Sequence, residues 1–271
     1  MLECWHEHRY GSTVFEKQKT DNSFLLIISD SITFWYAGGL AAFLVGFSKT
    51  GVPGLGIVIV PLMVMIFPAK QSVGALLIML MVGDLFALGW YRHHADWSRL
   101  WGLFPGIIAG MIVGGVILAR ITDTQMKPLL GWLILALVLL QICSVRFGWS
   151  EVPKHWLFVS VLGILAGFAT TIGNVAGPIM SIYLLAIGFS KEKFIGTGAW
   201  YYAIVNAMKV PLFYGLGMIT VETLRFNAVA VPAVVIGAVV GKLTLPRIPR
   251  VLFDRAVLIL AAVAAVRLLV G

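Results

Sequence analysis

The sequence carries little charge for its length. Only 12% of its 271 residues are Asp, Glu, Lys or Arg, and 60% are hydrophobic. Soluble domains carry about 25% charged residues, so this composition excludes both a soluble domain and a disordered chain. The apolar runs are continuous and do not alternate with period two, which argues against a β-barrel. We therefore expect an all-α, polytopic protein of the cell (inner) membrane, surrounded by the lipid bilayer.

Catalytic and metal-binding motifs are also missing. The chain has two cysteines, Cys4 and Cys143, which lie far apart and predict neither a disulfide nor a metal site. It lacks His-Glu-x-x-His, Gly-x-Ser-x-Gly and a Walker lysine, so we expect no enzyme, no catalytic residue and no cofactor. The net charge of +8 sits mainly between apolar runs, where basic residues set topology and contact lipid headgroups. Nucleic acid is therefore not an expected partner.

What the sequence does contain is an interruption at Ser48–Gly56. It places three glycines, a proline and a lysine between two apolar runs, Phe34–Phe47 and Leu55–Phe67. As a helix each run would be about 20 Å long, against a hydrocarbon core of roughly 30 Å. The pattern predicts a hairpin of half-helices with an irregular tip inside the membrane. Because unsatisfied backbone at that depth is costly, such a tip is a candidate binding site.

The pattern returns later in the chain at an offset of about 120 residues, which indicates an internal repeat. The short run Trp156–Ala169 ends in the polar tip Thr170–Gly177, and the next run, Pro178–Ile187, is again too short to cross. Full spans are expected at 71–91, 100–119, 126–145, 194–214, 222–241 and 251–269. The aligned positions are Gly46-Phe47 with Gly167-Phe168, Asp84 with Asn206, and Gly110-x-x-x-Gly114 with Gly237-x-x-x-Gly241.

These elements divide the chain into four parts: a polar tail at 1–23, a first membrane repeat at 24–146, a linker at 147–155 and a second repeat at 156–271. Each repeat contains one hairpin and three spans, which is an odd number of crossings whether or not the short runs cross. The second repeat is therefore expected to be inverted relative to the first. Inverted repeats with broken helices at the midplane are a common plan of secondary transporters.

Inversion would bring the two tips together at mid-depth, with the half-helices after them beginning at the tips. Helix N-termini carry partial positive charge and free N–H donors, so two of them facing one cavity favour an anion. The predicted substrate-binding residues are Ser48, Lys49, Thr50, Gly51, Gly54, Gly56, Thr170, Thr171, Gly173, Asn174 and Asn206. The alternative is that the glycines serve helix packing and that Lys49 extends to the membrane interface.

Two more charges lie inside expected spans, Asp84 and Lys209. Charged residues at this depth are expensive and usually face a pathway or a partner. We predict that Asp84 and Lys209 take part in proton coupling. The alternative is a structural role, with Lys209 pairing with Asp84 or attracting an anion.

Several of these motifs together resemble the TauE/SafE family of sulfite and organosulfonate exporters. They are the turn Gly51–Gly56 running into Val60-Pro61, the loop from Tyr91-Arg92 to Asp96-Trp97, the glycine-spaced helix after it and the weaker repeat. The resemblance covers about Phe34 to Leu269 and implies proton-coupled export of small sulfur oxyanions. One departure is the second tip, Thr170–Gly177, which has fewer glycines than the family pattern.

The sequence thus predicts a secondary transporter for a small anionic substrate, working by alternating access around the paired tips. The alternatives are a passive anion channel, a permease for small carboxylates and a membrane scaffold without transport. The glycine-rich faces are compatible with a homodimer as well as with packing inside one chain.

Overall fold

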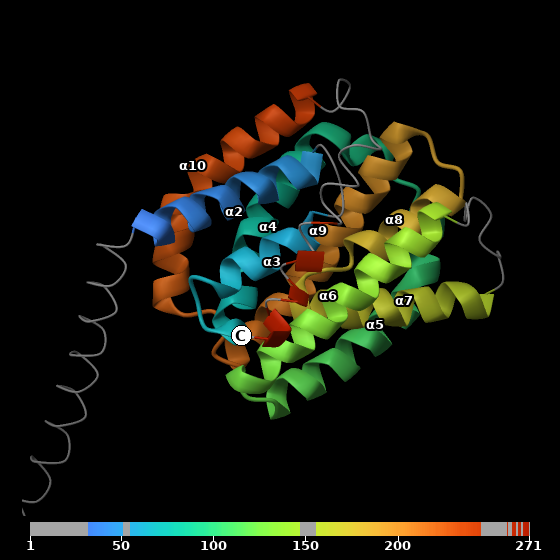
Figure 1. Cartoon of the computed structure of the whole chain (residues 1–271). Coiled ribbons are helices and arrows are strands. Elements are labelled where there is room, and N and C mark those ends of the chain that lie inside the picture. The colour runs from blue at the N-terminus through green and yellow to red at the C-terminus, as the bar shows by residue number, and fades with distance from the viewer. Residues whose placement is uncertain are drawn as a thin grey trace, which may run out of the picture.

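The computed structural model describes residues 32–50, 55–146 and 156–244, and near the C-terminus 259, 262–263, 265–266 and 268–270. The predicted tail, the linker and most of the last expected span lie outside the described residues. All regular structure in the described ranges is helical (Figure 1), as predicted. The elements are α2 (Ile32–Thr50), α3 (Gly56–Val64), α4 (Ala69–Tyr91), a 3₁₀ turn η1 (Arg92–His94), α5 (Trp97–Arg120), α6 (Asp123–Arg146), α7 (Trp156–Gly173), α8 (Gly177–Ala186), α9 (Lys191–Gly215) and α10 (Val221–Thr244).

Five of the described helices, α4, α5, α6, α7 and α10, are long and apolar enough to cross a membrane. The prediction of a polytopic helical membrane protein is confirmed. Four of the predicted spans correspond to α4, α5, α6 and α10, and the span expected at 194–214 is the 25-residue helix α9.

In both expected hairpins the described residues form a long first helix and a short second helix, and the first arm of each is longer than predicted. α2 has 19 residues and α7 has 18, whereas α3 and α8 have only 9 and 10. The prediction that Ser48–Thr50 belongs to an irregular tip is wrong, because α2 continues through Thr50. The Ser48 hydroxyl donates back to Val45 O in the preceding turn, whereas the Thr50 hydroxyl donates a bond of 2.7 Å to Ala238 O of α10 and a longer one, 3.4 Å, to Gly46 O.

The second hairpin breaks at Asn174, which adopts a left-handed conformation with φ of 57°. Asparagine tolerates this region better than most residues. Its Nδ2 donates a hydrogen bond of 2.9 Å to Val73 O of α4, which fixes the break against the centre of the molecule. The start of α3 touches the same point, since a Cβ added to Gly56 would lie 3.2 Å from Asn174 O. The beginning of the second arm of one hairpin therefore meets the break of the other.

Glycines hold together two helix pairs, and each pair joins a helix of the first half of the chain to a helix of the second half. A Cβ added to Gly110 of α5 would lie 2.0 Å from Ile164 O of α7, and one added to Gly237 of α10 would lie 2.0 Å from Phe43 O of α2. Only glycine allows backbones to approach this closely. In Figure 1 the α2–α10 pair and the α5–α7 pair lie on opposite sides of the molecule.

The contacts of these two pairs correspond position by position. Gly114 faces Thr171 and Phe168 O, and Gly241 faces Thr50 and Phe47 O. Thr50 and Thr171 are separated along the chain by the same number of residues as Phe47 and Phe168. The glycine-rich faces are therefore used for packing within the chain, between helices that the sequence repeat relates to one another.

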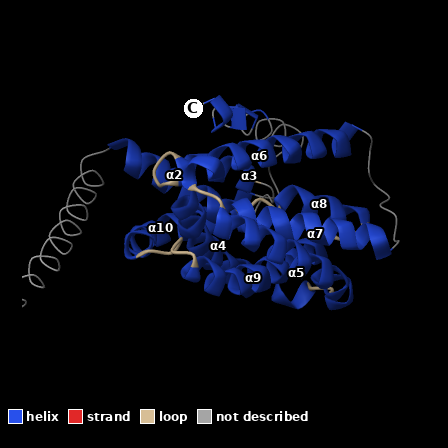
Figure 2. Ribbon diagram, turned by 90° about the horizontal axis from the view of Figure 1, so that it is seen from below, coloured by secondary structure: helices blue, strands red, loops and turns tan. Residues whose placement is uncertain are grey.

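The central helices α4 and α9 pack against each other. Gly74 near the start of α4 lies against Met218 O, just beyond the end of α9, and Gly196 near the start of α9 lies against Tyr91 O at the end of α4. In Figure 2, α6 lies on one side of the molecule and α9 on the other, with α4 and α8 between them. This arrangement places α4 and α9 next to the end of α2 and the break at Asn174.

Candidate functional site

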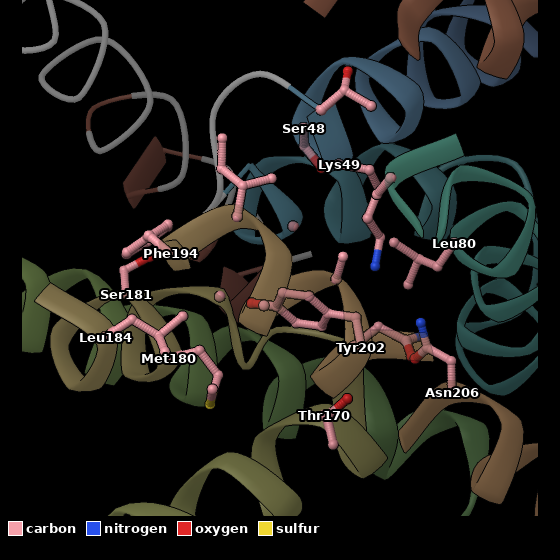
Figure 3. Close-up of a pocket in the computed structure, with 18 residues that line it drawn as sticks. Ser48, Lys49, Leu80, Thr170, Met180, Ser181, Leu184, Phe194, Tyr202 and Asn206 are labelled. Atoms are coloured by element: carbon pink, nitrogen blue, oxygen red, sulfur yellow. The ribbon is translucent and has the colours of Figure 1, made fainter. Parts of the chain in front are cut away.

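A cavity with about 770 Å³ of empty space, part of it open to solvent, lies where the two hairpins meet α4 and α9 (Figure 3). The first residues of the short arms, Gly56 of α3 and Gly177 of α8, both line it. The predicted site residues on its wall are Ser48, Lys49, Thr50, Gly56, Thr170, Asn174 and Asn206. Residues from both halves of the chain thus surround one space.

Lys49, in the last turn of α2, is the charged group on the cavity wall. Its Nζ lies 2.6 Å from Asp84 Oδ1, and its side chain is only 7% exposed. The ammonium also lies 4.2 Å from the centre of the Tyr202 ring, at the distance of a cation–π contact. Burial and these contacts contradict the alternative in which Lys49 extends to the membrane interface. Figure 3 shows the ammonium directed toward Asn206 and Tyr202.

Asp84 lies behind the cavity wall, between α2 and α9. Its Oδ1 is paired with Lys49, and its Oδ2 accepts a hydrogen bond of 2.6 Å from Asn206 Nδ2. Each carboxylate oxygen therefore has a partner, which is the condition for burying a charge at tolerable cost. The predicted structural alternative, an ion pair between Asp84 and Lys209, is not formed.

Lys209 is fully buried and holds the break between α7 and α8. Its Nζ donates to Thr170 O at 3.1 Å, to Thr170 Oγ1 at 2.9 Å and to Asn174 Oδ1. These three acceptors match the three donors of an ammonium group. No described carboxylate lies within ion-pair distance of it. Lys209 does not line the cavity, and Thr170 and Asn174, which its ammonium contacts, lie between it and the cavity.

The other predicted site residues have different surroundings. Thr171 donates to Gly167 O and packs against Gly114, and Gly173 lies against Leu130 of α6, so neither is on the cavity wall. The Ser48 hydroxyl points away from the Lys49 ammonium in Figure 3. Gly51 and Gly54 lie outside the described residues.

Some wall residues were not among those that the sequence predicts. Tyr202 and Ser181 line the cavity, together with apolar residues of α8 and α9. Tyr202 precedes Asn206 by four positions, so helical spacing alone places both on one face of α9. Ser181 follows Gly177 by the same spacing on α8. The helical face shared with the predicted site residue Asn206 was therefore a usable signal for Tyr202, whereas Gly177 was not a predicted site residue and gave no such signal for Ser181.

The electrostatics of the site favour a negative guest. Among the described residues, the buried charged side chains are Lys49, Asp84 and Lys209, which is one more positive than negative charge when all are ionised. The N-termini of α3 and α8 add partial positive charge at the cavity. The buried Lys49 ammonium and the two helix N-termini make the cavity a candidate site for an anion.

A helical membrane protein with an interior cavity between two broken hairpins is typical of membrane transporters. The sequence model of the family described as "Sulfite exporter TauE/SafE" matches residues 38–268. The chain belongs to this family, as the motifs of its sequence indicate. Membership implies a membrane transporter of sulfite or related anions rather than an enzyme. The comparisons with curated proteins and with solved structures give no match.

Proposed function

We propose that the protein is a secondary transporter that exports small sulfur oxyanions, sulfite or short organosulfonates, across the cell membrane. The observation that carries this proposal is Lys49, a buried cation on the wall of a cavity that the starts of α3 and α8 also line. Thr170, Asn174 and Asn206 surround the same space and add polar groups for the oxygen atoms of the substrate. The family match supports the same class of substrate.

The substrate competes with Asp84 for Lys49. In the structure the Asp84 carboxylate is paired with the Lys49 ammonium and accepts a hydrogen bond from Asn206, so it serves as an internal counter-anion. When Lys49 turns to the substrate, a carboxylate left without its cation in the interior is costly, so Asp84 takes up a proton. When the substrate leaves, Asp84 releases the proton and pairs with Lys49 again. This exchange carries one proton in the same direction as one substrate anion, so export is driven by the outward gradient of the anion.

Alternating access is supported by the matched packing of the two glycine-rich pairs. α2–α10 and α5–α7 are each locked by backbone contacts at corresponding positions, such as Gly237 with Phe43 and Gly110 with Ile164. We propose that the two repeats are inverted and that these pairs move as rigid units around α4 and α9. The cavity between them then opens first to one side and then to the other.

Flux through proteoliposomes containing the purified full-length protein tests the proposal. We expect sulfite movement to be abolished by Lys49→Ala and unchanged by Lys242→Ala, a matched control whose ammonium lies over the Trp90 ring, away from the cavity. Sulfite flux that survives Lys49→Ala would overturn the role of the lysine.

An imposed pH gradient separates a transporter from a channel. With the membrane potential held at zero, we expect the gradient to concentrate methanesulfonate, which is ionised on both sides, in vesicles with the wild-type protein, and Asp84→Asn to permit only downhill movement. Under these conditions a passive channel would not concentrate it. Concentration that persists in Asp84→Asn would remove Asp84 from the coupling.

A permease for small carboxylates is a second candidate, because Lys49 and Asn206 already hold a carboxylate, that of Asp84. Competition of sulfite flux by acetate and oxalate distinguishes the two. Equal or stronger inhibition by the carboxylates than by unlabelled sulfite would favour the permease.

The homodimer stays a prediction, since the glycine faces that suggested it are used inside the chain.

A further inference from the structure

Lys209 of α9 is a buried cation that the proposed transport cycle does not use. Its side chain is fully buried, and its ammonium donates to Thr170 O, Thr170 Oγ1 and Asn174 Oδ1. These acceptors are a backbone carbonyl, a hydroxyl and a side-chain amide, and none of them carries a charge. Burying a charge is costly, so an ammonium held by neutral oxygens requires surroundings that suit a cation.

The other buried lysine has a different kind of partner. Lys49 and Thr170 occupy corresponding positions in the two halves, since each directly precedes one member of the matched pair Thr50 and Thr171. In the first half the ammonium belongs to the hairpin and lies 2.6 Å from a carboxylate of the central helix α4, that of Asp84. In the second half the ammonium belongs to the central helix α9, and its acceptors at the hairpin are neutral oxygens. The second contact is therefore the coordination of a cation by oxygen atoms and not an ion pair.

The end of α7 supplies the electrostatic field that a cation requires. α7 ends at Gly173, and its last carbonyl groups carry the partial negative charge of a helix C-terminus. The ring of Phe213, one turn after Lys209, has its centre 5.8 Å from the ammonium, which is within the range of a cation–π contact. Carbonyl groups at the ends of broken helices coordinate sodium in secondary transporters. The oxygens at this break are a donor set of the same kind.

We propose that the break between α7 and α8 is a binding site for a monovalent cation, and that the Lys209 ammonium is the cation that occupies it in this chain. The site takes a single charge, because divalent ions are held with the help of carboxylates and the three acceptors here are neutral. The protein thus carries, attached to α9, an ion that would otherwise come from solution. This assigns Lys209 a fixed charge in place of the part in proton coupling that the sequence predicts.

Lys209→Ala tests the inference, because it removes the attached cation and leaves the oxygen atoms in place. The removed atoms vacate room for roughly a sodium ion and two water molecules. We expect sodium chloride, compared with choline chloride at equal ionic strength, to stabilise the purified full-length variant and not the wild-type protein. The melting temperature of the variant should rise by about 3–5 °C for each tenfold increase in sodium concentration above the dissociation constant.

Two further variants locate the sodium ion. Lys209→Met fills the vacated space with an apolar chain, so it should be destabilised relative to wild type and show no response to sodium. Thr170→Val, added to Lys209→Ala, removes the Oγ1 ligand with little change in side-chain volume. This double variant should bind sodium about tenfold more weakly than Lys209→Ala.

Stabilisation by sodium that is found in Lys209→Ala, and not in wild type or Lys209→Met, would support the cation site. Equal stabilisation of all three proteins would place the ion elsewhere and overturn the inference, as would a sodium affinity that Thr170→Val leaves unchanged. Absence of a response in Lys209→Ala, or failure to recover it folded in sodium, would also overturn the inference, because a bound ion should replace the ammonium. These measurements require no transport, so their outcome leaves the proposed function unaffected.

Discussion

Asn206 donates a hydrogen bond of 2.6 Å to Asp84 Oδ2, and the two residues occupy aligned positions in the two halves of the sequence. α4 and α9 each bring a polar side chain to the same point, one as an acceptor and the other as a donor. Lys49 then completes the cluster from α2. The aligned positions of the two halves thus contribute different parts of one polar cluster: Asp84 contributes the carboxylate, and Asn206 contributes a hydrogen-bond donor to it.

The Lys49–Asp84 pair should show strong coupling in a double-mutant cycle. Lys49→Met or Asp84→Asn alone leaves one buried charge without its counter-ion, and we expect each to cost about 3–5 kcal/mol of unfolding free energy. The double variant should cost much less than the sum, because no charge is then left unpaired. Thermal and denaturant unfolding in detergent measure this, and additive effects would contradict a tight pair.

The glycines that pack α5 on α7 and α2 on α10 should be equally sensitive to an added methyl group. A methyl group at Gly110 or Gly237 would meet backbone at 2.0 Å, so we expect Gly110→Ala and Gly237→Ala each to destabilise by about 1–3 kcal/mol or more. Gly102 of α5 has nothing within 4 Å of an added Cβ. Gly102→Ala should therefore be neutral or stabilise by up to about 1 kcal/mol. Melting temperatures of the three variants check this, and a tolerated Gly110→Ala would exclude the close packing of α5 on α7.

Lys209 should be needed mainly for the α7–α8 break. Lys209→Met removes the donor for Thr170 and Asn174, and leaving buried acceptors unsatisfied costs about 1–3 kcal/mol. We expect reduced stability with little change in the dissociation constant of sulfite, because Lys209 does not line the cavity. Loss of pH-driven accumulation at unchanged stability would instead support the predicted role of Lys209 in proton coupling.

Asn174 combines a backbone requirement with a side-chain requirement. Asn174→Ala and Asn174→Gly both lose the bond to Val73 O and the acceptor for Lys209. Alanine also pays about 1–2 kcal/mol for the left-handed φ of 57°, which glycine does not. We expect the alanine variant to unfold at the lower temperature. Equal stability of the two variants would show that the backbone conformation carries no cost there.

The features that could be predicted from the sequence are those with a local signal. The spans of α4, α5 and α10 follow from continuous apolar runs, and the breaks follow from dense glycine and proline beside polar residues. The extension of α2 through Lys49 could not be predicted in this way. A lysine after an apolar run reads as the end of a membrane helix, and only its distant partner, Asp84, makes its burial tolerable.

The partners of the charged residues needed tertiary information. Lys49 and Lys209 were both available to Asp84, and nothing in their spacing shows that α2 reaches it while α9 turns its lysine to Thr170. The contribution of Met180 and Leu184 of α8 to the cavity wall was equally hidden. Met180 and Leu184 have the pattern of core residues, and only the empty space beside them distinguishes a binding wall from packing.

The exchange of helices between the two halves also bears on how the chain is made. α5 is synthesised before α7, and α2 long before α10, so each glycine-lined face enters the membrane ahead of the helix that covers it. Until the later helix arrives, lipid must occupy those faces. The N-terminal half therefore cannot reach its final packing before the second half has been synthesised. These two contacts are completed only when α7 inserts beside α5 and α10 beside α2.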